Sequence, residues 1–164
     1  MLSLPKIERV TRDATLVHFF LMFGYRIFSL YFPLFLLAKS FSLAQVGYTY
    51  FFIYLPIAIF APFIGFLNHK INPALLASLG ILGYGLYALG MILISFASQV
   101  GIILFYFWQV ILGISASLFF VSMRAVLISS PLENYNRAFG WFYSAPYYAG
   151  AIAPAVSALF IWKF

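Results

Sequence analysis

Two long apolar runs joined by a short polar break constrain this chain more than any other feature. The runs cover residues 47–67 and 74–97, and the break between them reads Asn-His-Lys-Ile-Asn-Pro at 68–73. Each run has about twenty residues, enough at ~1.5 Å of rise per residue to cross a hydrocarbon layer of ~30 Å. Because a backbone in lipid must satisfy its own hydrogen bonds, the two runs are predicted to form a helical membrane hairpin with a tight turn.

The composition extends this prediction to the whole chain. Hydrophobic residues make up 65% of the 164 positions and charged residues only 7%, which is outside the range of a soluble domain. The net charge of +6 would suggest a nucleic-acid partner in a soluble protein, but here we attribute it to loop charges and expect no nucleic acid. Three acidic residues, two histidines and no cysteine predict neither a metal site nor a catalytic triad, so we expect no enzyme and no cofactor.

The apolar segments predict an all-α fold, a polytopic transmembrane bundle of about five membrane-spanning helices in one domain over 1–164. The expected helices cover 14–38, 47–67, 74–97, 101–129 and 138–162. An odd number of spans puts the termini on opposite sides. One side collects six basic residues and the other two, namely Lys6, Arg9, Arg12, Lys70, Arg124 and Arg137 against Lys39 and Lys163. This asymmetry predicts a cytoplasmic N-terminus in an integral membrane protein, with a prokaryotic plasma (inner) membrane as the default location.

Arg26 is the most informative single residue. It lies about twelve residues into the first predicted helix, close to the middle of the bilayer, where a charge costs on the order of 3 kcal/mol unless it meets water or a partner. No acidic residue is predicted at a similar depth. An anionic substrate in a wet cavity, a carboxylate from another part of the protein, a ring of carbonyls and snorkelling all remain open. A side chain that pointed into lipid, or lay at the surface, would remove the case for a solute pathway.

Three further polar residues could line such a pathway. His18 precedes Arg26 by about two turns and could carry protons near the inner mouth, or be a capped, interfacial histidine. Tyr25 could line a polar path or belong to the aromatic belt at the membrane interface. Gln109 is an intramembrane amide that could bind a substrate or another helix.

The polar break and the fifth apolar segment resemble the Major Facilitator Superfamily. In that family the loop between the second and third helices reads Gly-x-Leu-Ala-Asp-Arg-x-Gly-Arg-Lys. Gly65, Leu67 and Lys70 match this pattern, whereas His69 stands at the Asp position. The fifth-helix pattern of the antiporter branches is filled here by small residues or proline, namely Gly140, Ala149, Ala153, Pro154 and Ser157. The alternative is ordinary small-residue packing between helices.

The resemblance also assigns roles at the inner side of the membrane. Gln109 replaces an Arg of the fourth-helix pattern that the family associates with proton coupling, which puts proton-driven exchange in doubt. Arg124 and Arg137 fall where family members place basic residues that latch the inward gate, together with Gly65, His69 and Lys70 of the inner loop. The alternative is that Arg124 and Arg137 anchor helix ends to lipid phosphates.

Members of this family have twelve helices in two halves, with the solute held near the midplane. The resemblance therefore implies that this chain is the N-terminal portion of a secondary transporter, incomplete by itself. The expected function is alternating-access transport of a small solute, anionic if Arg26 binds it. The expected partners are lipid, that solute, and a missing C-terminal half or another membrane chain. The alternative is a small structural or assembly protein that packs against a partner membrane protein.

Overall fold

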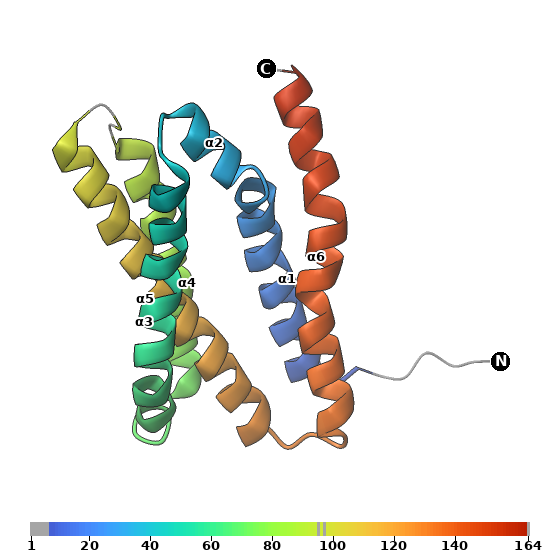
Figure 1. Cartoon of the computed structure of the whole chain (residues 1–164). Coiled ribbons are helices and arrows are strands. Elements are labelled where there is room, and N and C mark those ends of the chain that lie inside the picture. The colour runs from blue at the N-terminus through green and yellow to red at the C-terminus, as the bar shows by residue number, and fades with distance from the viewer. Residues whose placement is uncertain (1–6, 95, 97, 164) are drawn as a thin grey trace. The chain divides into compact units, whose positions relative to one another are not determined.

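The computed structural model describes residues 7–94, 96 and 98–163, and every regular element among them is helical. The elements, coloured along the chain in Figure 1, are α1 (Arg9–Ser29), α2 (Phe32–Ala38), α3 (Leu43–Leu67), α4 (Pro73–Leu93), α5 (Gln99–Ser129) and α6 (Tyr135–Lys163). The predicted all-α class is confirmed. Of the residues used above, Lys6 and the expected helix end at Ala97 lie outside the described residues.

The chain forms two compact units. The first, here called the α1–α6 unit, comprises Met1–Pro33 and Leu127–Phe164. The second comprises Leu34–Val126 and is here called the three-helix unit after its long helices, α3, α4 and most of α5; it also contains most of the short α2. Chain ends that are far apart in sequence therefore meet in one unit, where α1 and α6 pack along each other. The sequence predicted one domain over 1–164, and the structure divides the chain into two compact units.

The first expected helix, 14–38, is two helices separated by a turn at Leu30 and Tyr31. Pro33 explains the interruption, because proline has no N–H to donate to the Ser29 carbonyl and its ring crowds that carbonyl. Pro33 itself lies in the first turn of α2, where a missing donor costs little. The apolar pattern runs through the break without a change, so the pattern alone predicts one continuous helix.

Local capping defines the joint between α2 and α3. Ser40 has φ 65°, and the Phe41 N–H donates to the Leu36 carbonyl at 3.1 Å, which closes α2 with a left-handed C-terminal cap. Ser42 then begins α3 with a capping box, in which its hydroxyl accepts from the Gln45 N–H and the Gln45 side chain accepts from the Ser42 N–H. These two caps allow a chain reversal within a few residues.

The turn between α3 and α4 follows the prediction closely. Helix α3 ends at Leu67, and Asn72 caps α4 by accepting the Ala74 N–H at 2.9 Å. Pro73 occupies the first position of α4, where its fixed φ suits a helix start. Helix α3 begins at Leu43, earlier than expected, because the capping box extends it, and α4 ends at Leu93.

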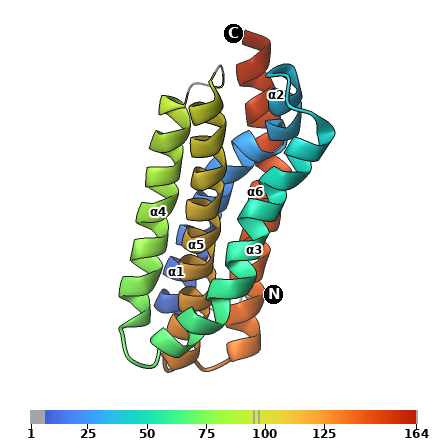
Figure 2. The ribbon, with the colours of Figure 1, turned by 60° about the vertical axis from the view of Figure 1, so that its left-hand side comes forward.

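Within the three-helix unit, α4 approaches α5 through glycines, as Figure 2 shows for the two neighbouring ribbons. A Cβ added at Gly80 would lie 2.6 Å from the Phe119 backbone nitrogen and 2.8 Å from the Ser115 carbonyl oxygen. Gly83 faces Ser115 and Gly90 faces the Trp108 ring just as closely. In lipid, helix association depends on such close packing rather than on the hydrophobic effect.

Four stretches of the described chain are long and apolar enough to cross a membrane by length and composition alone. They are Arg9–Ala38, Leu43–Leu67, Pro73–Leu93 and Val100–Ser129. Helix α6 covers the fifth expected span and has 29 residues, but it is not among these four stretches.

The glycine contact can be tested by replacing Gly80 with alanine. Because the added methyl would meet α5 backbone rather than a flexible side chain, Gly80→Ala is expected to lower the free energy of unfolding by about 1–3 kcal/mol. The measurement is the thermal unfolding midpoint of the purified chain in detergent. Gly85→Ala is the matched control, since nothing lies within 4 Å of its Cβ position. Equal midpoints for the two variants would contradict the close approach.

Candidate functional site

The candidate site is built on the packed faces of α1 and α6. Buried residues recur every three or four positions on both helices, namely Thr11, Ala14, His18 and Met22 on α1 and Ala138, Phe142, Ala145, Ala149, Ala153 and Ser157 on α6. This spacing puts each set on one face of its helix. Most of the α6 residues are small, which permits close approach between helices.

His18 joins the two helices near the middle of this face. Its Nδ1 lies 2.9 Å from the Phe142 carbonyl oxygen, and its ring centroid lies 4.4 Å from that of the Phe142 ring. The side chain is 2% exposed. The spacing in the sequence predicted that His18 and Arg26 share a broad face of the first helix. In the structure the Nδ1 of His18 contacts the backbone of α6.

Ser157 makes a second interhelical bond in the opposite direction. Its hydroxyl donates to the Ile27 carbonyl at 2.7 Å. That carbonyl lacks its usual helical donor because the Tyr31 N–H turns to the Phe28 carbonyl instead, at the end of α1. Ser157 belongs to the small-residue pattern of α6, so a position expected only to pack also donates a hydrogen bond.

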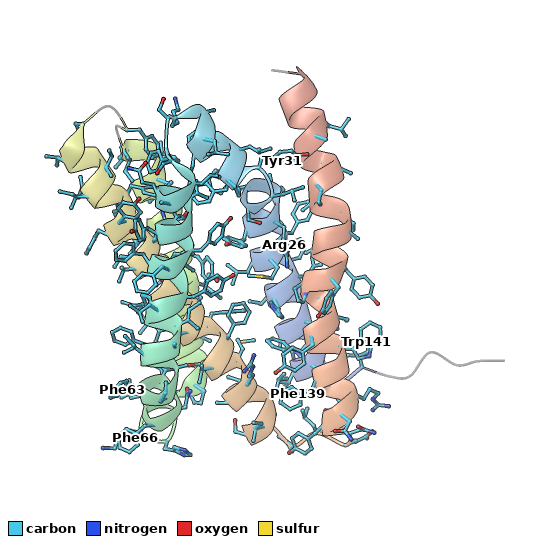
Figure 3. All side chains as sticks on the ribbon, in the orientation of Figure 1. Arg26, Tyr31, Phe63, Phe66, Phe139 and Trp141 are labelled. Atoms are coloured by element: carbon cyan, nitrogen blue, oxygen red, sulfur yellow. The ribbon has the colours of Figure 1, made fainter. Side chains whose placement is uncertain are left out.

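Arg26 lies in the last turn of α1 and is exposed, and Figure 3 shows it a short distance before Tyr31. Among the described residues, no carboxylate lies within salt-bridge distance of its guanidinium. The carbonyl end of a helix carries partial negative charge, which favours a cation there. Tyr25, its neighbour, is half-buried.

The beginnings of α1 and α6 are connected by a carboxylate. Glu8 Oε1 accepts the backbone N–H of Glu133 at 2.9 Å, one residue before Asn134, which caps α6 by accepting the Arg137 N–H. The Arg137 guanidinium lies 3.7 Å from the Glu133 carboxylate. The sequence predicted that Arg137 would pair with an acid or anchor in lipid. Glu8 was not singled out, because nothing in its sequence neighbourhood indicates a loop more than 120 residues away.

Gln109, in the three-helix unit, is fully buried and has partners on two helices. Its Oε1 accepts from the Tyr87 hydroxyl of α4 at 3.4 Å, and its Nε2 donates to the Phe105 carbonyl at 3.3 Å and contacts the Met91 sulfur at 3.7 Å. The amide therefore joins α4 to α5. Of the two readings that the sequence left open, this placement favours helix packing over substrate binding.

The inner-loop residues lie on the α3–α4 turn and near the end of α5. His69 and Lys70 are exposed, and the Lys70 Nζ lies 4.6 Å from the centroid of the Phe66 ring. Nothing lies within 4 Å of a Cβ built at Gly65. Arg124 is exposed on α5, about one turn before the helix ends.

The fifth-helix pattern divides into two groups in the structure. Ala149 and Ala153 are fully buried and Ser157 is nearly so, whereas Pro154 is half-buried. Gly140 is exposed, and a Cβ there would meet nothing within 4 Å. Gly140 therefore lies off the packed face, because nine residues of helix place it away from the side that Ala149 and Ala153 share.

No described group of three or more His, Asp or Glu side chains could hold a metal ion. The fold and the site together define a polytopic helical membrane protein with one exposed arginine near a break in its first span. The family comparison then identifies its class. A family model, the Major Facilitator Superfamily, matches residues 14–164, and the chain belongs to that family of membrane transporters. No curated protein and no solved structure matches the chain.

The Ser157 bond can be tested by removing its hydroxyl. Ser157→Ala leaves the Ile27 carbonyl without that donor and is expected to cost about 0.6 kcal/mol of unfolding free energy, the average for interhelical hydrogen bonds in membranes, and no more than about 1.7 kcal/mol, the largest such value. The measurement is denaturant-induced unfolding in mixed micelles. Ser144→Ala is the control, because its hydroxyl bonds the Trp141 carbonyl of its own helix. A Ser157→Ala chain no less stable than Ser144→Ala would contradict the bond.

Proposed function

We propose that the chain forms the N-terminal portion of a secondary transporter that moves a small anionic solute by alternating access. The observation that supports the anionic solute is Arg26. It is an exposed cation in the Arg9–Ala38 span, and no described carboxylate neutralises it. The proposal requires this exposed side to face a solute pathway shared with a C-terminal half or another membrane chain, because an Arg26 that faced lipid would remove the case for the pathway. Membership of the Major Facilitator Superfamily supports the part of the proposal that concerns membrane transport.

The energetics of Arg26 favour a ligand with negative charge. A charged group near the centre of a bilayer costs on the order of 3 kcal/mol or more when it is not compensated. The carbonyl end of α1 supplies only about half an elementary charge, so the helix end offsets part of this cost. An anion bound beside the guanidinium would supply the remainder, and it would bind where the first span is interrupted.

The other residues predicted for the pathway take different roles in this proposal. Tyr25 precedes Arg26 on α1 and would contact the same solute, whereas His18 and Gln109 hold helices together. His69, Lys70, Arg124 and Arg137 would lie at the cytoplasmic side, with the N-terminus, in the orientation that the basic residues favour. Transport would require a C-terminal half or another membrane chain, against which this portion moves.

Neutralising Arg26 tests the proposal. In cells that express the chain within its complete reading frame, Arg26→Gln is expected to reduce uptake of the transported anion about tenfold or more, since loss of one charge-assisted contact costs roughly 1.5–3 kcal/mol. Uptake would be measured with a panel of radiolabelled monocarboxylates, dicarboxylates and inorganic phosphate. Arg26→Lys should retain part of the uptake because it keeps the charge.

Arg9→Gln is the matched control, because Arg9 is an exposed cation at the other end of the same helix. It should leave uptake close to the unmodified level, and all variants should insert equally, as judged by membrane fractionation. Unchanged anion uptake by Arg26→Gln would contradict an anionic solute. No uptake of any solute by the unmodified protein would contradict transport and favour the assembly role.

A further inference from the structure

Helix α6 continues without interruption through Pro146, although this proline removes one of its backbone hydrogen bonds. The missing N–H would have donated to the carbonyl four residues earlier, which is the carbonyl of Phe142. A carbonyl left without a donor in an apolar environment is costly, so neighbouring helices usually supply a replacement. The Phe142 carbonyl of α6 therefore needs a hydrogen-bond donor from elsewhere in the protein.

The imidazole of His18 is that group. Its Nδ1 lies 2.9 Å from the Phe142 oxygen, the ring packs against the Phe142 ring, and the side chain is 2% exposed. A carbonyl oxygen only accepts hydrogen bonds, so Nδ1 must carry the proton. The contact thus defines both the partner of the freed carbonyl and the tautomer of the histidine.

We propose that His18 is a positioning residue that replaces the backbone donor lost at Pro146 and thereby holds the proline-containing segment of α6 against α1. The proposal does not depend on the transported solute. In this proposal His18 stabilises the backbone of α6. The sequence had left open whether His18 transfers protons or is a capped, interfacial histidine.

Pro154 in the same helix provides a natural comparison. It removes the donor to the Gly150 carbonyl in the same way, yet no side chain in the described part of the chain donates to that oxygen. The two prolines therefore differ in one respect that can be tested: among the described residues, the carbonyl freed by Pro146 has an interhelical side-chain donor and the carbonyl freed by Pro154 does not. Replacing each by alanine would restore a backbone bond at both sites but change the environment of His18 only at the first.

The tautomer of His18 tests the proposal directly. The chain has two histidines, so nitrogen NMR of the chain labelled with ¹⁵N-histidine gives two sets of ring signals, and His69→Gln assigns them. At pH 8, where an unperturbed imidazole is neutral, His18 is expected to carry its proton on Nδ1. In Pro146→Ala the Phe142 carbonyl accepts the alanine N–H, and the Nδ1 signal should shift toward the unprotonated position. Pro154→Ala should leave it unchanged.

Two results would overturn the proposal. A proton on Nε2 of His18 in the unmodified chain would exclude donation from Nδ1 to the carbonyl, whatever the variants show. Equal signals for Pro146→Ala and Pro154→Ala would show that His18 does not respond to the backbone bond lost at Pro146. The first result requires no variant to fold, and exposed His69 provides an internal reference in the same spectrum.

Discussion

A backbone carbonyl without a donor is the constraint that shapes the α1–α6 unit. In water such a group is solvated, but in lipid or a packed helix interface it is costly unless the protein supplies a donor. Among the described residues, the carbonyl freed by Pro146 in α6 and the one at the end of α1 are each bonded by a side chain of the other helix, His18 and Ser157 respectively. The Gly150 carbonyl, freed by Pro154, has no such side-chain donor in the described part of the chain. Each of these two helices therefore has a carbonyl without a backbone donor, and a side chain of the other helix bonds it.

The helices of the three-helix unit are held together in a different way. There α4 meets α5 through glycines whose missing side chains allow backbone contact, and one buried amide, Gln109, joins the same two helices. Polar bonds add to an interface that close packing already defines. In the α1–α6 unit the small residues of α6 pack against α1, and the His18 and Ser157 hydrogen bonds connect the two helices.

Much of this could be predicted from the sequence, for physical reasons that differ between elements. The α3–α4 turn was predictable because the polar break, the Asn72 cap and Pro73 all act locally. The glycines of α4 are typical of close helix packing, but nothing in the sequence indicates that Ser115 and Phe119 are the facing residues. The apolar pattern did not predict the break between α1 and α2, because Pro33 changes hydrogen bonding without changing hydropathy. The His18 bond was not predicted, because its acceptor is a backbone oxygen and a search for side-chain motifs does not consider backbone oxygens. Pro146 is the signal that could have indicated it, since a proline there leaves the Phe142 carbonyl without its helical donor.

A double-mutant cycle between His18 and Pro146 measures whether the imidazole compensates for the backbone donor lost at the proline. His18→Leu should lower the unfolding free energy of the chain by about 0.6 kcal/mol, the average for interhelical hydrogen bonds in membranes, and by no more than about 1.7 kcal/mol. In the Pro146→Ala background the same substitution should cost clearly less, because the Phe142 carbonyl then accepts the alanine N–H. An equal cost of His18→Leu in both backgrounds would show that His18 does not compensate for the proline, and would contradict the account.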